Sequence, residues 1–185
     1  MPFTVYGRAG SHEGEVGVGI YYYDAAENKI EEKAFITSTK SFAIAEDELG
    51  KMVYYNQSTS LLHVLADGTL YRIDLKKDEK KVLAENLTDE RYAVSDDGHL
   101  MVYQTGGKTD KSATLHIMNL KSERIIRSKR KMGKTCASWV YQRRFIYGKV
   151  NPADTGITVS GEEITPMYEV QIRNSKNKEA AQYNF

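Results

Sequence analysis

Short runs of apolar and β-branched residues recur along the chain at nearly even spacing, and each run ends in Tyr. The runs cover residues 3–6, 51–54, 100–103 and 144–147, and their tyrosines lie 48, 49 and 44 residues apart. A period of about 20 to 50 residues is typical of solenoids, propellers and other arrays, in which one unit buries its apolar face only against its neighbours. The pattern therefore predicts a repeat protein built from β-strands.

The third copy predicts its strands most clearly. Residues 91–94 form an apolar run, residues 95–98 end in Asp97-Gly98, and residues 100–104 resume the β pattern. Asp-Gly between two β runs is a strong hairpin signal, because Gly adopts positive φ without steric cost. After a polar loop, two further strands are expected at 114–120 and 124–127. Each repeat is therefore predicted to contain four antiparallel strands.

The other strands of the repeat recur as well. Third strands are expected at 20–24, 70–75, 115–120 and 167–172, and final strands at 29–37, 80–86, 124–129 and 179–185. First strands are expected at 42–44, 92–94 and 136–138, where Ala43, Ala93 and Ala137 lie 50 and 44 residues apart. A small residue there suits a strand that packs near a crowded axis.

A four-stranded antiparallel unit repeated about every 45 residues describes a β-propeller blade. We expect an all-β fold of about 15 strands, with an incomplete first blade at 1–37 and further blades at 38–86, 87–130 and 131–185. The chain opens on a second strand, so the expected arrangement is a partial or half ring, completed by a segment outside this chain or by another copy. A four-bladed ring short of one strand is the alternative, and a β-sandwich would lack the fourfold self-similarity.

Two phrases carry a resemblance to a known class of repeats. Residues 92–103, which read YAVSDDGHLMVY, and residues 68–75, which read GTLYRIDL, resemble blades of TolB-like and WD40-like propellers. The resemblance extends over most of the chain through short, degenerate phrases. It departs where residues 139–144 replace the Asp-Gly turn, and the Trp-Asp dipeptide of WD40 blades is absent.

Composition is that of an ordinary globular protein. The 185 residues are 41% hydrophobic and 28% charged, and 26 basic residues against 25 acidic residues give a formal charge of +1. No global charge therefore draws the chain to nucleic acid or anionic membranes. Cys136 is the only cysteine, so no internal disulfide can form. No secretory signal and no apolar run of about 20 residues are present, so we expect a soluble protein, in the cytoplasm or, if the chain is a trimmed fragment, outside it.

Basic residues are concentrated between positions 124 and 144. The candidate binding residues are Arg127, Lys129, Arg130, Lys131, Lys134, Arg143 and Arg144, and Arg124 precedes them. Such a run can bind an acidic partner, a nucleic acid backbone or an anionic surface. The alternative is a solvated outer strand, which lysine and arginine protect from edge-to-edge aggregation. No interleaved aromatic residues accompany the run, which makes single-stranded nucleic acid a poor candidate.

Two Gly-Lys-Thr sequences resemble part of a phosphate-binding loop. The full motif requires an earlier glycine, where Ser128 and Val102 stand, and a helix afterwards. A strand is expected after Lys134-Thr135, and a hairpin surrounds Lys108-Thr109. Neither sequence predicts a phosphate site, and no motif predicts a cofactor.

The remaining candidates are single residues and loops. His12, His63, His99 and His116 are scattered, so their spacing predicts no metal site; we expect His116 on a strand and the others in or near loops. Cys136 lies on the expected first strand at 136–138, which aligns with the strands of Ala43 and Ala93, and this predicts a buried thiol, although nearby Lys134 and Arg143 could make it reactive if exposed. The insert at 151–166 is expected to be a solvent loop, with an acidic cation site as the alternative.

Neither Gly-x-Ser-x-Gly nor His-Glu-x-x-His occurs, so no catalytic residues are predicted. We expect a non-enzymatic module that binds a protein, peptide or glycan through the loops at one propeller rim. Self-association through open blade edges is a further possibility. The alternative is the gating propeller of a larger serine hydrolase of the prolyl oligopeptidase type, which a Gly-x-Ser-x-Gly sequence elsewhere in the parent reading frame would favour.

Overall fold

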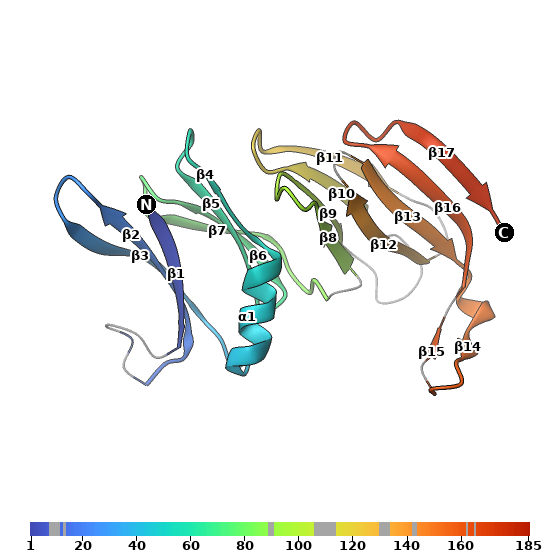
Figure 1. The fold of residues 1–185 in the computed structure, drawn as a ribbon, viewed down its shortest axis with the longest axis horizontal. Helices are drawn as coiled ribbons and strands as arrows, with labels where there is room; N and C mark the ends of the chain where they lie inside the picture. The colour runs from blue at the N-terminus through green and yellow to red at the C-terminus, as the bar shows by residue number, and fades with distance from the viewer. Residues whose placement is uncertain are drawn as a thin grey trace. The chain divides into compact units, whose positions relative to one another are not determined.

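The chain forms two compact units, residues 1–86 and residues 87–185. The computed structural model describes residues 1–7, 12, 14–88, 91–105, 114–129, 134–141, 144–161, 163–164 and 166–185. Each unit contains two principal antiparallel sheets, which we name A and B in unit 1 and C and D in unit 2 (Figure 1). No helix in these described ranges is long and apolar enough to cross a membrane.

Unit 1 contains seven strands and a helix within its described residues. Sheet A consists of β1 (Pro2–Gly7), β2 (Gly17–Asp24) and β3 (Lys29–Thr37). Sheet B consists of β4 (Val53–Asn56), β5 (Leu61–Ala66), β6 (Thr69–Asp74) and β7 (Glu79–Ala84). Helix α1 (Phe42–Lys51) connects the two sheets.

Unit 2 contains two four-stranded sheets and an insert. Sheet C consists of β8 (Tyr92–Val94), β9 (Leu100–Thr105), β10 (Thr114–Asn119) and β11 (Arg124–Lys129). Sheet D consists of β12 (Lys134–Tyr141), β13 (Arg144–Val150), β16 (Met167–Asn174) and β17 (Glu179–Asn184). The insert between β13 and β16 contains a short 3₁₀ helix (Pro152–Asp154) and the hairpin β14 (Gly156–Ile157) and β15 (Glu163–Ile164).

Within each sheet, neighbouring strands pair antiparallel in the order in which they occur in the chain. This meander of three or four strands is the architecture of a propeller blade. The predicted all-β fold class is therefore confirmed, and sheets A to D contain 15 strands among the described residues.

The turn predicted at 95–98 forms as expected. Gly98 has φ +67°. The Ser95 backbone N–H donates to the Leu100 carbonyl at 2.8 Å, and the Leu100 backbone N–H donates to the Ser95 hydroxyl at 3.0 Å. Asp97 accepts hydrogen bonds from the Ser95 hydroxyl at 2.6 Å and from the His99 backbone at 3.0 Å. These bonds stabilise the carboxylate and lower the pKa of Asp97 to about 2.

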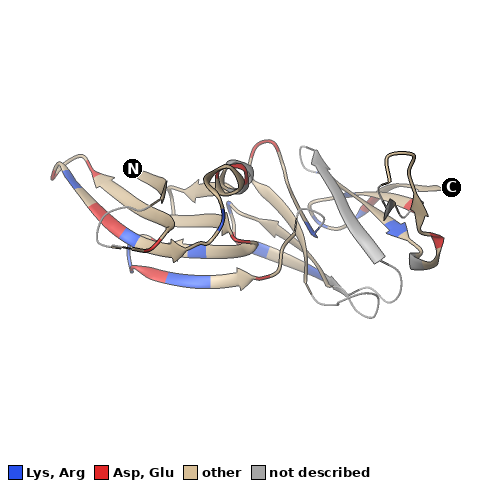
Figure 2. Ribbon diagram, turned by 90° about the horizontal axis from the view of Figure 1, so that it is seen from below, with Lys and Arg blue, Asp and Glu red and all other residues tan. Residues whose placement is uncertain are grey.

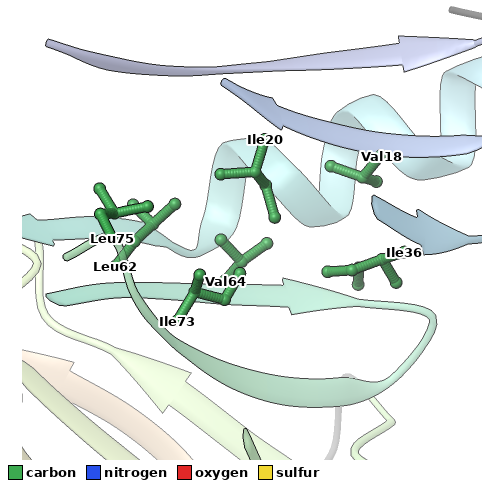
Figure 3. Packing of buried hydrophobic residues seen from close by; sticks show 8 residues of the cluster. Val18, Ile20, Ile36, Leu62, Val64, Ile73 and Leu75 are labelled. Carbon is green, nitrogen blue, oxygen red and sulfur yellow. The ribbon is translucent and has the colours of Figure 1, made fainter. Parts of the chain in front are cut away.

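The core of unit 1 lies between the facing sides of sheets A and B. Val18, Ile20 and Ile36 of sheet A contact Leu62, Val64 and Ile73 of sheet B, as Figure 3 shows. The core of unit 2 is made in the same way: Leu100, Val102, Leu115 and Ile117 of sheet C contact Phe145 and Tyr147 of sheet D. Each unit is therefore held together by burial of one face of each sheet, which is the dominant stabilising term for packed sheets.

Charged residues are placed on the outer strands of unit 1. Strand β3 carries Lys29, Glu31 and Lys33, and strand β7 carries Lys80 and Lys81. Figure 2 shows such charged residues as blue and red bands along the strands. Two lysines hold the Glu31 carboxylate, at 2.7 Å and 3.0 Å, and lower the pKa of Glu31 to about 2. Charges on edge strands disfavour pairing with other chains.

The strand predicted at 42–44 is wrong, because these residues begin helix α1. The segment FAIAEDELGK contains Ala, Glu and Leu, which favour helix, and Ile44 is its only β-branched residue. Ser41 precedes the helix and accepts a backbone hydrogen bond from Ala45. The first strand of sheet B is instead β4, which contains Val53 and Tyr54. The sequence pattern assigns these two residues to a second strand, but the second strand of the sheet is β5.

Candidate functional site

The predicted basic binding residues lie in several parts of unit 2. Arg127 and Lys129 belong to β11, Lys134 begins β12 and Arg144 begins β13, while Arg130, Lys131 and Arg143 lie outside the described residues. Strand β11 is one edge of sheet C, and β12 lies against β8 and β9 near its other edge. The basic residues therefore do not share one strand.

The strand register divides these residues between two ends of sheet D. Lys134 pairs with Val150 at the end of β13, whereas Arg144 starts that strand and pairs with Tyr141. Lys129 ends β11 and precedes Lys134 by five positions. Lys129, Lys134 and the insert at 151–166 thus mark one end of unit 2, which we call the rim of unit 2, and Arg144 lies at the opposite end of its sheet.

The insert on this rim is an ordered element rather than the plain solvent loop that we expected. The Asn151 side chain accepts a hydrogen bond of 3.2 Å from the backbone of Ala153 and so caps the 3₁₀ helix. Strands β14 and β15 then pair to form a hairpin. Ile157 is 77% exposed and Val159 is fully exposed, so the hairpin presents apolar side chains to solvent.

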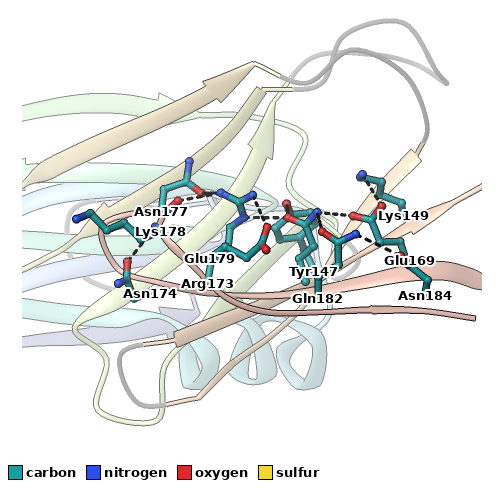
Figure 4. Close-up of polar contacts among 11 residues, drawn as sticks. Tyr147, Lys149, Glu169, Arg173, Asn174, Asn177, Lys178, Glu179, Gln182 and Asn184 are labelled. Atoms are coloured by element: carbon teal, nitrogen blue, oxygen red, sulfur yellow. Dashed lines mark hydrogen bonds and ion pairs between the residues drawn. The ribbon is translucent and has the colours of Figure 1, made fainter.

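An ion pair lies at the base of the insert. Lys149 Nζ is 2.7 Å from Glu169 Oε2, and these residues lie on the strands that enter and leave the insert. Glu169 is buried and also accepts a hydrogen bond from Gln171 Nε2. Gln171 in turn accepts a hydrogen bond from the buried hydroxyl of Tyr147 (Figure 4). Lys149 and Gln171 therefore compensate for the energetic cost of burying the Glu169 carboxylate.

The network continues to the outer strand of sheet D. Arg173 donates from Nε to Gln171 Oε1 at 2.9 Å, lies 5.9 Å from the centre of the Tyr147 ring, and contacts Glu179 Oε2 at 3.4 Å. Figure 4 shows these groups in a row across three strands. A connected polar network specifies one arrangement of its strands, so the hairpin is mounted on a well-defined base.

In unit 1, helix α1 connects β3 to β4. Ser38, which is buried, donates a hydrogen bond of 2.8 Å to Asp67 in the turn between β5 and β6. Tyr6 donates to the carbonyl of Lys40 just before the helix. Phe42 and Ile44 are exposed, but they lie about 200° apart around the helix axis. They therefore do not form one apolar surface.

The histidines lie in different elements of the described part of the chain. No group of three or more potential metal ligands occurs among the described residues. His116 lies on β10 as expected, where Nε2 is 2.6 Å from Thr105 Oγ1 and the ring stacks on Tyr103 at 4.7 Å. Burial, assisted by the charge of Arg127, lowers the pKa of His116.

The placement expected for His63 is wrong, because His63 is fully buried in β5 rather than near a loop. His12 lies in a loop and is held against sheet A, 2.7 Å from Glu32 and stacked on Phe35. The second Gly-Lys-Thr sequence is followed by a strand, since β12 begins at Lys134. The sequence at 106–109 and the side chain of Cys136 lie outside what the structure describes.

Comparison with known proteins shows similarity in fold alone. No family model and no curated protein matches the chain. Among solved structures, the tricorn protease is 14% identical with a TM-score of 0.40, over 92% of this chain and 16% of that chain. An oligogalacturonate lyase in complex with manganese is 12% identical with a TM-score of 0.41, over 99% of this chain and 48% of that chain.

TolB from Acinetobacter baumannii is 11% identical with a TM-score of 0.34, over 95% of this chain and 50% of that chain. These structures are β-propeller proteins. The chain spans between 16% and 50% of the lengths of these three structures. Similarity at this level carries no information about activity or ligand.

The candidate residues predicted from the sequence do not include Ile157 and Val159. A signal for them exists, because the β-branched run Ile157-Thr158-Val159 lies between Gly156 and Gly161. Glycines that flank a short β-branched run are typical of a hairpin.

Proposed function

We propose that this chain is a non-enzymatic module that binds a protein partner at the rim of unit 2. The observation that carries the proposal is the exposure of Ile157 and Val159 on a hairpin mounted on a hydrogen-bonded base. Propellers commonly bind through elements that connect their strands, because a rigid scaffold holds those elements in fixed positions. An isolated two-stranded hairpin is only marginally stable in water, and contact with a partner would stabilise it.

The chemistry of the rim indicates the kind of surface that fits it. Ile157 and Val159 favour an apolar depression, since burial of each side chain contributes about 1.5 to 3 kcal/mol. Lys129 and Lys134 stand at the neighbouring strand ends, and the candidates Arg130 and Lys131 lie between them in sequence. The partner surface is therefore apolar where it receives the hairpin and acidic beside it.

Photo-crosslinking tests the proposal. A photoreactive residue is placed at position 159 in one variant and at position 82 in the control, because Val82 is also an exposed valine, 45% exposed, on β7 of unit 1. Both variants are irradiated in lysate of the cells that make the protein. We expect one defined protein to crosslink from position 159 and not from position 82, and Ile157→Ser to reduce that yield.

The same proteins crosslinked from both positions, or no crosslink at 159, would overturn the proposal. A crosslink to a hydrolase domain of the same polypeptide would instead select the gating-propeller alternative. The captured protein is then purified, and its direct binding to this chain decides whether the crosslink reports a specific complex.

A further inference from the structure

The outer face of sheet D, which points away from sheet C, is apolar. Phe145 and Tyr147 point toward sheet C, so the alternation of side chains directs Ile146 to the other face. The strand register places Ile172 beside Ile146, and it places Tyr183 beside Val170. Ile146, Val170 and Ile172 are partly exposed and Tyr183 is 54% exposed. These four residues define the outer face of sheet D.

The outer face of sheet A, which points away from sheet B, is also apolar. Phe3 and Tyr21 are neighbours in the register and stack with ring centroids 5.6 Å apart. Val5 and Phe35 flank Gly19 in the next row. Val5 is 38% exposed, whereas the His12 ring stacks on Phe35. Exposed apolar sheet faces of this kind mark interaction surfaces.

The two faces carry opposite charges. Glu32 lies beside Tyr21 on the outer face of sheet A. Burial raises the pKa of the Tyr21 phenol, and the neighbouring Glu32 carboxylate raises it further. Arg144 is exposed on the outer face of sheet D, where it pairs with Asn174. His12 Nε2 lies 2.7 Å from Glu32 Oε1, so a contact between the two faces offers Arg144 a carboxylate that His12 also contacts.

Within each unit, consecutive sheets of the chain pack face to face, and the two outer faces can pair in the same way. In unit 1, sheet A presents one face to the sheet that comes next in the chain, and in unit 2 sheet C does the same toward sheet D. The outer face of sheet D is the face that would meet a following sheet, and the outer face of sheet A is the face that would meet a preceding one. Inside each unit, a face of the following-sheet kind packs against a face of the preceding-sheet kind. The outer faces of sheets D and A are one of each kind.

We propose that the outer face of sheet D binds the outer face of sheet A of a second copy of this chain. The contact is heterologous, because two different surfaces meet, and it joins two blades by sheet-on-sheet packing. It uses sheet faces rather than the open strand edges considered from the sequence. It also leaves the hairpin on the rim of unit 2 outside the contact.

Light scattering on a sizing column tests this contact with the wild-type chain and three variants at about 200 µM. Tyr183→Glu places a charge on the outer face of sheet D, and Val5→Glu places one on the outer face of sheet A. Val82→Glu is the matched control, since Val82 is exposed on a strand of sheet B. Circular dichroism verifies that each variant is folded.

We expect the wild type and Val82→Glu to show a mass of at least twice 21.0 kDa, and Tyr183→Glu and Val5→Glu each to remain at 21.0 kDa. Mixing those two variants restores one intact pair of faces, so the mixture is expected at twice 21.0 kDa. A monomeric wild type overturns the proposal. So does self-association of either single variant, which would indicate contact between identical faces, or a mixture that stays monomeric.

Discussion

Lys149 and Glu169 form an ion pair of 2.7 Å between the strands that enter and leave the insert of unit 2. Glu169 is buried, whereas Lys149 is only partly so. Breaking a fully buried pair costs roughly 3 to 5 kcal/mol, because one charge remains without compensation. The largest effect is therefore expected when Lys149 alone is removed, because the buried Glu169 carboxylate then loses its ion-pair partner.

Lys149→Met is expected to reduce the free energy of unfolding by about 2 kcal/mol, less than for a fully buried pair because Lys149 is partly exposed. Lys149→Met combined with Glu169→Gln removes both charges and is expected to recover most of the loss. Urea unfolding followed by circular dichroism measures both effects. Equal losses in the single and double variants would show that the ion pair is not the cause.

Gly17 lies where sheet A leaves no space for a side chain. A Cβ on Gly17 would lie 2.2 Å from the backbone oxygen of Ile36 and 2.8 Å from the Phe35 ring. Gly17→Ala is therefore expected to destabilise unit 1 by about 2 kcal/mol or more. Gly156→Ala is the matched control, because nothing lies within 4 Å of its Cβ position. Thermal unfolding of the two variants compares them, and equal midpoints would contradict the packing described for sheet A.

His116 gives the stability of unit 2 a dependence on pH. Its pKa is lowered by burial and by Arg127, while an unfolded histidine has a pKa of about 6.5. Below about pH 6.5 the unfolded chain therefore binds more protons than the folded chain does, and the free energy of unfolding decreases as the pH falls. Above that pH the contribution of His116 to the free energy of unfolding is fully present. His116→Gln is expected to flatten this dependence in urea titrations between about pH 5 and pH 8. An unchanged slope would exclude His116 as its source.

The basic run makes a separate prediction about binding. Arg130→Glu with Lys131→Glu reverses two charges that lie between Lys129 and Lys134 in the sequence, and we expect weaker partner binding with a reduced dependence on salt. Lys80→Glu with Lys81→Glu, on the outer strand of sheet B, is the control pair. Calorimetry at two salt concentrations measures the effect. Unchanged binding would remove the basic run from the site.

The repeat in the sequence predicts the strands of sheet C correctly, because alternation, the Asp97-Gly98 turn and strand length all agree there. It does not predict α1. The alignment of Ala43 with Ala93 favours a strand at 42–44, whereas the helix propensity of the surrounding residues favours the helix that forms. It also misses β5, a fully buried strand whose residues do not alternate between apolar and polar.

Strand β16 shows why the candidate site was harder to predict. Its polar residues Glu169 and Gln171 lie on the same side as Tyr147, toward sheet C, and Val170 and Ile172 lie on the outer face. Alternation alone assigns apolar side chains to the core. In β16 the inward-facing residues are polar instead, because hydrogen-bond and ion-pair partners on β13, β16 and β17 satisfy them. Those partners come together only in the folded sheet.

The affinity of the captured partner for the purified chain tests the central claim most directly. Isothermal titration calorimetry compares the wild type, Ile157→Ser with Val159→Ser, and the control Val82→Ser. Loss of two buried apolar side chains is expected to weaken binding by at least about tenfold, while Val82→Ser binds as the wild type does. Wild-type affinity in the hairpin variant would contradict the assignment of the rim of unit 2 as the binding surface.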